Sequence, residues 1–140
     1  MVVEGVKKGD NPDATTIWSV LGYPPCSYAV AAWVKAGDDI ARIISASEEG
    51  HSPINLMAVD FKRKVFPVDR GNGKRYMKVD VIERAVEALR PYEEASMRRA
   101  VEVRDRIAKQ GFSRSLVAEY NKFVDESAPK RDEVVRQVAN

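Results

Sequence analysis

The sequence predicts a mainly α-helical protein: a helical bundle with an extended N-terminal arm and one basic β-hairpin inserted between helices. Three observations predict this fold. Apolar residues recur at steps of three and four through most of the chain after residue 25. Glycines and prolines separate these periodic segments. Residues 56–79 depart from the helical period and place two short apolar runs around a Gly-Asn-Gly turn, which is typical of a hairpin.

The composition limits the possible classes of protein. The chain has 140 residues, of which 44% are hydrophobic and 31% charged, so it can form a core. It has no apolar run of membrane-spanning length and no signal-peptide core, so we expect a soluble, cytoplasmic protein without a membrane span. One cysteine and one histidine exclude an internal disulfide and a closed zinc site, so we expect no metal and no cofactor. The scarcity of cysteine and glutamine favours a thermophilic source.

Residues 1–24 are predicted to form the arm, and residues 25–140 a single mainly helical domain. The arm has turn-forming residues at positions 9–13 and no apolar period. Its large apolar residues, Trp18 and Tyr23, precede the pair Pro24-Pro25, which prevents a helix from continuing through this point. We expect Trp18 and Tyr23 to anchor the arm on a neighbouring subunit, although packing on its own domain would explain them as well.

The first helix of the domain is predicted over residues 25–49. An apolar stripe runs from Val30 to Ile44, and Gly50 is a natural stop. Gly37 lies on that stripe, which predicts a close approach of another element there.

The C-terminal half is predicted to hold four shorter helices. The first begins near Asp80, and Pro91 ends or kinks it and begins the second, which continues to Gln110. Ser113 begins the third and Pro129 a short fourth. Their apolar faces include Val86 and Met97.

The basic charge of the chain is concentrated in the predicted hairpin. The formal net charge is +2, but residues 61–78 hold seven basic residues and one acidic residue, so this segment carries 7 − 1 = +6 and the remainder 2 − 6 = −4. Such a patch predicts contact with the phosphates of a nucleic acid, whereas charges that only protect an edge strand from aggregation are the alternative. The candidate contacts are Lys62, Arg63, Lys64, Arg70, Lys74, Arg75 and Lys78.

Residues 107–121 resemble the helix-turn-helix of bacterial repressors, with a glycine turn at Gly111 and a second helix that opens at Arg114. The resemblance implies that Arg114 reads bases in the major groove. The chain departs from that pattern at Ile107, where the family usually has an alanine four residues before the turn glycine. A serine-capped αα-hairpin without a role in DNA binding explains the same residues.

No catalytic arrangement emerges from the sequence. Cys26 and His51 are the single thiol and the single imidazole, and nothing local indicates that they activate one another. The segment from Asp69 to Arg75 lacks the spacing and the Ser or Thr of a nucleotide-binding loop. We therefore expect a protein that is not an enzyme.

The layout of an arm, a Pro-Pro joint and a helical body resembles the coat (major capsid) proteins of filamentous archaeal viruses. The resemblance implies a self-assembling structural subunit that packages DNA in a virion, and therefore self-association or a paralogous subunit as partner. Small helical subunits of archaeal CRISPR effector complexes are similar in size and helical content. A helical module of another protein complex, with a merely solvated basic hairpin, is a further alternative.

Overall fold

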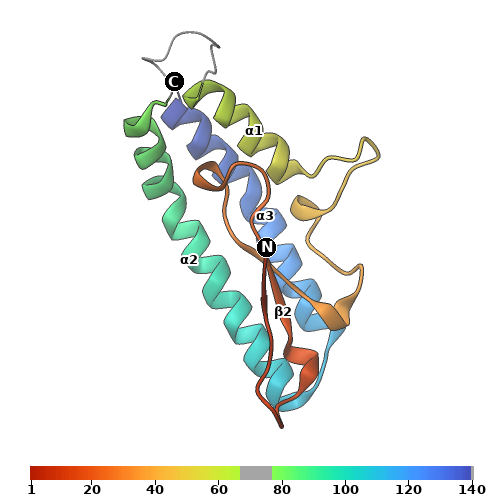
Figure 1. Cartoon of the computed structure of the whole chain (residues 1–140). Coiled ribbons are helices and arrows are strands. Elements are labelled where there is room, and N and C mark those ends of the chain that lie inside the picture. Colours follow the sequence, from red (N-terminus) through yellow and green to blue (C-terminus); the bar gives the residue numbers. More distant parts are fainter. Residues whose placement is uncertain (67–76, 140) are drawn as a thin grey trace.

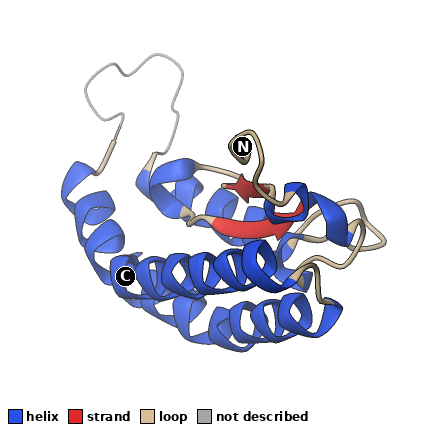
Figure 2. Cartoon of the chain, turned by 90° about the horizontal axis from the view of Figure 1, so that it is seen from below, coloured by secondary structure: helices blue, strands red, loops and turns tan. Residues whose placement is uncertain are grey.

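The structure is a computed structural model that describes residues 1–66 and 77–139. This part of the chain is mainly helical and has a small antiparallel sheet near its N-terminus (Figures 1 and 2). The helices are α1 (Pro53–Val65), α2 (Val79–Gln110) and α3 (Arg114–Ala139), and the strands are β1 (Val2–Glu4), β2 (Thr16–Ser19) and β3 (Val30–Trp33). Short 3-10 turns are η1 (Pro12–Ala14), η2 (Pro24–Cys26), η3 (Val34–Ala36) and η4 (Arg42–Ile44). No helix among the described residues could cross a membrane.

Helices α2 and α3 form a long antiparallel hairpin that supports the rest of the chain (Figure 1). The turn between them uses Gly111 at φ +87°, a conformation that glycine adopts without steric cost. We expected Pro91 and Pro129 to separate helices, but both lie inside continuous helices. Proline removes one backbone donor, and packing of the apolar face on either side keeps the helix continuous through it.

The sheet has the order β1-β2-β3, and all its pairs are antiparallel. Every residue of β3 is buried, and the Tyr120 hydroxyl of α3 accepts a 2.9 Å hydrogen bond from the Ala31 N–H. The same hydroxyl lies 3.0 Å from Ser96 Oγ of α2, and the Tyr120 ring meets Trp33 edge to face at 5.2 Å. One tyrosine therefore joins β3, α2 and α3 in the core.

Two expectations for the N-terminal third were wrong. The helix over residues 25–49 does not form, since this segment holds β3 and three 3-10 turns joined by loops. A strand that is buried on both faces lacks polar alternation, so its apolar run and its flanks resemble a helical stripe. Residues 1–24 do not form an extended arm but supply β1 and β2. Strand β1 pairs with β2, and β2 pairs with β3 of the same chain.

The predicted hairpin over residues 56–79 was also wrong in its first half, which belongs to α1. Ile54, Ala58, Phe61 and Val65 are buried at spacings of four, three and four, which is a helical period. Pro53 starts this helix at a position that proline favours. The Gly-Asn-Gly turn, with Arg70, Lys74 and Arg75, lies outside the described residues.

The close backbone approach that we expected at Gly37 occurs at Gly22 instead. A Cβ atom on Gly37 would meet no atom within 4 Å, whereas a Cβ on Gly22 would lie 2.7 Å from Ala58 Cβ of α1. Gly22 therefore lets the loop after β2 pack directly on α1.

Candidate nucleic-acid interface

Four of the predicted phosphate contacts lie at one end of the molecule, where α1 ends and α2 begins. Lys62, Arg63 and Lys64 form the last turn of α1, and Lys78 directly precedes α2. The Lys78 N–H donates a 2.8 Å hydrogen bond to the Val65 carbonyl, so the two flanks of the basic segment are held together. Cations in the last turn also interact favourably with the carbonyl end of a helix. We call Lys62, Arg63, Lys64 and Lys78 the basic end.

The side chains of the basic end differ in their surroundings. Lys62 is half-buried, with its Nζ 5.5 Å from the centre of the Tyr23 ring. Arg63 lies 3.5 Å from an Asp60 carboxylate oxygen in an exposed pair, which contributes little to stability. Lys64 and Lys78 are exposed, and neither forms an ion pair with a residue in 1–66 or 77–139. Within the basic end, these two lysines are therefore the most available phosphate contacts.

A groove of about 640 Å³ lies beside the basic end, between α1, the loop before it and the last turns of α3. We call it the α1/α3 groove. Its apolar lining residues include Leu56, Met57, Phe61, Val135 and Ala139, and its charged lining residues are Asp60, Arg63, Lys64, Asp132 and Arg136. The groove thus combines an apolar floor with a mixed but cation-rich rim.

Asp132 is a partly buried carboxyl group that lines the groove. Burial raises the pKa of Asp132 above the ordinary value, while the nearby cations Arg136 and Arg131 oppose that shift.

Arg114 does not belong to the basic end. It is the first residue of α3, whereas Arg136 of the groove lies near the end of that helix, about 33 Å away at 1.5 Å per residue. Its guanidinium pairs with the Asp39 carboxylate, and Asn121 Nδ2 donates to the Asp39 carbonyl at 3.1 Å. Helices α2 and α3 run side by side in opposite directions, which is the αα-hairpin alternative rather than the crossed pair of a helix-turn-helix (Figures 1 and 2).

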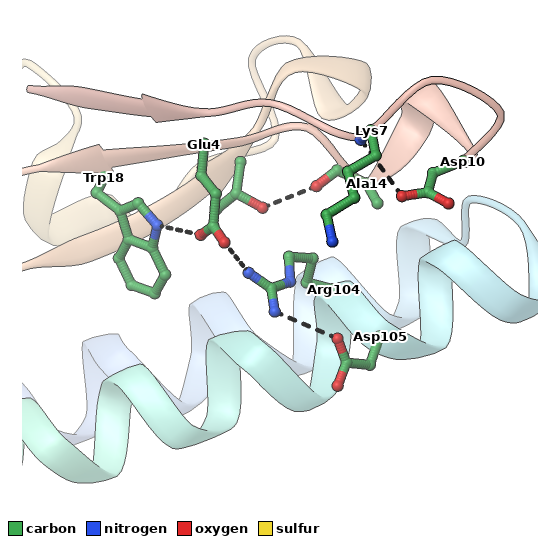
Figure 3. Close-up of polar contacts among 8 residues, drawn as sticks. Glu4, Lys7, Asp10, Ala14, Trp18, Arg104 and Asp105 are labelled. Atoms are coloured by element: carbon green, nitrogen blue, oxygen red, sulfur yellow. Dashed lines mark hydrogen bonds and ion pairs between the residues drawn. The ribbon is translucent and has the colours of Figure 1, made fainter.

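The predicted subunit contacts, Trp18 and Tyr23, make contacts within their own chain. Trp18 Nε1–H donates a 2.9 Å hydrogen bond to Glu4, whose carboxylate also accepts from Arg104 of α2. Figure 3 shows Glu4 between Trp18 and Arg104, so this carboxylate ties β1 and β2 to the helical hairpin. Tyr23 lies under Lys62.

The Cys26 and His51 side chains lie in different surroundings. Cys26 is fully buried in a core cluster with Phe61 and Ile82, and burial raises the pKa of its thiol to about 12. A thiol with this pKa holds almost no thiolate at neutral pH, so Cys26 is a poor nucleophile. His51 is exposed at the rim of the α1/α3 groove. Within residues 1–66 and 77–139, no group of three His, Cys, Asp or Glu side chains could hold a metal ion.

The sequence reasoning missed Arg131 and Arg136 of α3. Arg131 is fully buried, and its guanidinium carbon lies 4.0 Å from the centre of the Tyr28 ring and 5.9 Å from that of Tyr92. Position 131 follows buried Val124 by seven residues and precedes buried Val135 by four, so the helical period marked it as a core position. Arg136 is exposed and lines the groove.

The structure places Lys62, Arg63, Lys64, Lys78 and the groove at one end of the molecule and Arg114 at the other. Function must be inferred from these residues alone, because no protein-family model, no curated protein and no solved structure matches the chain.

Proposed function

We propose that this chain is a non-enzymatic nucleic-acid-binding subunit that holds phosphates at its basic end and self-assembles along DNA as a coat or nucleoprotein. The observation that carries the proposal is the hydrogen bond between Lys78 and Val65. It brings together the two flanks of the segment that carries a formal charge of +6. The remaining cations of this segment, Arg70, Lys74 and Arg75, lie outside the described residues.

The expected binding mode follows from the chemistry of these side chains. Lysine and arginine contacts to phosphate oxygens supply affinity and carry no sequence information. Exposed Lys64 lies in the last turn of α1 and exposed Lys78 directly before α2, and Arg136 adds a cation from α3 on the groove side. Binding should therefore depend strongly on salt and weakly on base sequence, which suits a protein that covers DNA of any sequence.

The test is fluorescence anisotropy with labelled duplex DNA, single-stranded DNA and RNA over a salt series. We expect the double variant Lys64→Gln/Lys78→Gln to weaken binding to all sequences alike and to reduce the slope of log K against log salt by about 2. The matched control is Lys109→Gln/Lys122→Gln, which removes the same charge from exposed positions elsewhere on α2 and α3. Equal losses in both variants would show that only the total charge matters and that the basic end is not the site.

A second candidate is a helical interaction module of a protein complex that does not contact nucleic acid, and the α1/α3 groove favours it. The groove exposes Leu56 beside partly buried Met57, and exposed apolar surface of this kind is typical of protein contacts. This candidate predicts no binding to any nucleic acid even at low salt, so the same titration separates the two functions.

A further inference from the structure

The two edges of the sheet differ in how their backbone groups are satisfied. At the end of the β2–β3 ladder, the Val34 N–H donates a 3.2 Å hydrogen bond to the Thr15 carbonyl. Because hydrogen-bonded and non-hydrogen-bonded pairs alternate along an antiparallel ladder, Ala31 directs its N–H away from β2. The Tyr120 hydroxyl of α3 accepts that N–H. The edge of the sheet at β3 is therefore closed within the chain.

The opposite edge of the sheet, at β1, is open. The same alternation makes Val2 and Glu4 the residues of β1 that bond to β2, whereas Val3 lies opposite Ile17 in a non-hydrogen-bonded pair. The N–H and C=O of Val3 therefore point away from the sheet, and no residue in 1–66 or 77–139 bonds to them. Strand β1 also has no lysine and no proline, the residues that commonly block an exposed edge.

Exposed apolar side chains gather beside this open edge. Twelve large apolar side chains are exposed within residues 1–66 and 77–139, and six of them belong to the first six residues or to the part of α2 next to β1. We call these six residues the β1 patch, which consists of Met1, Val2, Val3, Val6, Met97 and Val101. A contiguous apolar surface of this kind is typical of an interaction site.

The α2 residues of the β1 patch lie where a fourth strand would run. Glu4 of β1 contacts Arg104 of α2 (Figure 3). Around the helix axis, Arg104 lies about 40° from buried Ala100 at about 100° per residue. Met97 and Val101 lie about 60° and 100° from it in the same sense, so they follow directly after the position of β1. A strand added about 4.8 Å beyond β1 would therefore cover both side chains.

The charged residues of α2 around the β1 patch are engaged within the chain. Those that lie three or four positions from Met97 or Val101 each have a polar partner. Arg98 lies 3.8 Å from Glu94, and Arg104 lies 3.4 Å from Asp105. The Glu93 carboxylate accepts a 3.0 Å hydrogen bond from the backbone N–H that precedes β3. An approaching strand thus meets apolar side chains and ion pairs rather than a row of like charges.

We infer that β1 of one copy of the chain pairs antiparallel with β1 of a second copy around a two-fold axis at Val3. Each Val3 N–H donates to the Val3 carbonyl of the other copy, so the two three-stranded sheets become one continuous sheet. Val2 lies opposite Glu4 of the other copy. Met1 lies opposite Gly5, where a Cβ atom would meet nothing within 4 Å, so the methionine side chain has room.

A second copy is the occupant because this edge is complementary to itself. The two-fold axis turns the outward groups of Val3 toward their own equivalents, and each β1 becomes the fourth strand over Met97 and Val101 of the other copy. One contact therefore covers both β1 patches. Glu4 is the single charged side chain of β1, and Arg104 and Trp18 hold it within its own chain. Pairing of the two strands thus brings no free carboxylate into the contact.

The inference rests on the self-association in the proposed function and names the surface that carries it. The contact uses the same residues on both copies, so it is isologous and closes at a dimer. Assembly along DNA would then join such dimers through other surfaces.

The first experiment is sedimentation equilibrium of the full chain over a concentration series without nucleic acid. We expect a dimer that dissociates on dilution, because the contact is small. Val3→Pro removes the outward N–H but no bond to β2, and should weaken dimerisation by at least about tenfold. Circular dichroism controls for folding. A full chain that stays monomeric at every concentration, or a Val3→Pro variant that dimerises normally, would overturn the inference.

A pair of variants on α2 tests whether the added strand covers the helix. Val101→Gln should weaken dimerisation by about threefold, because it places an amide under the strand. The matched control is Val86→Gln, since Val86 is 40% exposed against 37% for Val101 and lies about 22 Å away along the same helix. Equal effects of the two substitutions would show that the strand does not lie over Val101.

Cross-linking tests the register independently of stability. Val3→Cys places two thiols across the axis, with Cα atoms about 5.5 Å apart, which suits a disulfide. Val2→Cys is the matched control, because the same axis separates its two Cα atoms by about 8 Å, beyond the usual reach of a disulfide. Cys26 is buried and does not compete. With an added thiol oxidant, Val3→Cys alone should give a covalent dimer. Equal cross-linking of both variants, or none of Val3→Cys, would contradict the pairing.

The anisotropy titration separates this inference from the proposed function, because the Val3 variants retain Lys64 and Lys78. A chain that stays monomeric but binds DNA with a steep salt dependence would overturn the strand pairing alone. A chain that dimerises through β1 but binds no nucleic acid would overturn the proposed function alone.

Discussion

Arg131 is a cation in the hydrophobic core, and its surroundings offer little compensation. Its Nε and Nη1 have no hydrogen-bond partner in the described part of the chain, and Nη2 reaches the Tyr92 carbonyl at 3.5 Å. Contact of the desolvated guanidinium with the Tyr28 ring contributes about 2 kcal/mol. Removal of a guanidinium from water costs several kcal/mol, so the balance at this residue is unfavourable.

We expect Arg131→Met to raise the free energy of unfolding by about 1 kcal/mol, because methionine keeps the length of the side chain and removes the buried charge. Urea denaturation at neutral pH measures the change. The companion variant Arg131→Lys keeps the charge but loses the flat guanidinium over Tyr28 and should lower stability. A less stable methionine variant would show that the two tyrosine rings compensate the charge fully.

The burial of single residues was predicted correctly from the sequence for some residues and wrongly for others. The helical period identified Ile82, Ala100 and Ile107 as core residues, and all three are buried. The same period placed Val86 and Met97 in the core, yet both are exposed. The apolar face of α2 is wider than the surface that packs on it, so residues at the edge of that face remain exposed. Charge alone could not place Arg131 inside, since burial of an arginine depends on partners distant in sequence.

At the scale of elements, secondary structure was predicted correctly where the hydrophobic periodicity extends over many residues. Helices α2 and α3 were anticipated over almost all their residues, since periodicity over 26 or more positions is unambiguous. Residues 56–65 were mistaken for a strand because the β-branched and aromatic residues near Val65 outweighed the four-three-four spacing of Ile54, Ala58, Phe61 and Val65. Strand β3 was mistaken for a helix because it is only four residues long.

The contact between the loop at Gly22 and α1 is a testable feature at this scale. Gly22→Ala should lower the free energy of unfolding by about 2–4 kcal/mol, since the alanine would be strained at φ +82° and its Cβ would clash with Ala58. Thermal and urea unfolding measure the loss.

Gly37→Ala is the matched control for this variant. Gly37 also has a positive φ, +61°, but open space around the position of a Cβ. It should therefore show the backbone strain alone, and Gly22→Ala should cost about 1–3 kcal/mol more. Equal costs for the two substitutions would mean that the loop moves away from α1 without penalty.

At the scale of the whole molecule, the sequence predicted the mainly helical class and missed the sheet. Strands β1 and β2 were invisible because their three and four residues are too short for a pattern, and their partner β3 was assigned to a helix. The basic end could be recognised from the sequence, because its cations are close together along the chain. The α1/α3 groove was not recognisable, because its walls are at least 68 residues apart in the sequence (Lys64 to Asp132) and meet only in the fold.

Deletion of residues 1–20 tests whether the N-terminal segment serves its own domain. We expect the deletion to lower the melting temperature strongly, because it removes β2, the strand partner of β3, together with buried Ala14 and Thr16. Deletion of residues 1–4 removes only edge strand β1 and should have a smaller effect. Melting followed by circular dichroism compares the two chains. If the chain without residues 1–20 melts normally but assembles poorly, that result would instead support the subunit-anchoring role expected for Trp18 and Tyr23.

The junction at Tyr120 has a consequence for how the protein is made. The ribosome produces β3 early, but the Ala31 amide meets its partner hydroxyl only 89 residues later. Until both α2 and α3 have been synthesised, the four apolar residues of β3 lack their full cover on the helical side. A nascent chain with such a segment is open to aggregation and to chaperone binding for most of its synthesis. The yield of this protein in a cell therefore depends on how fast translation proceeds from β3 to α3, and not only on the stability of the finished fold.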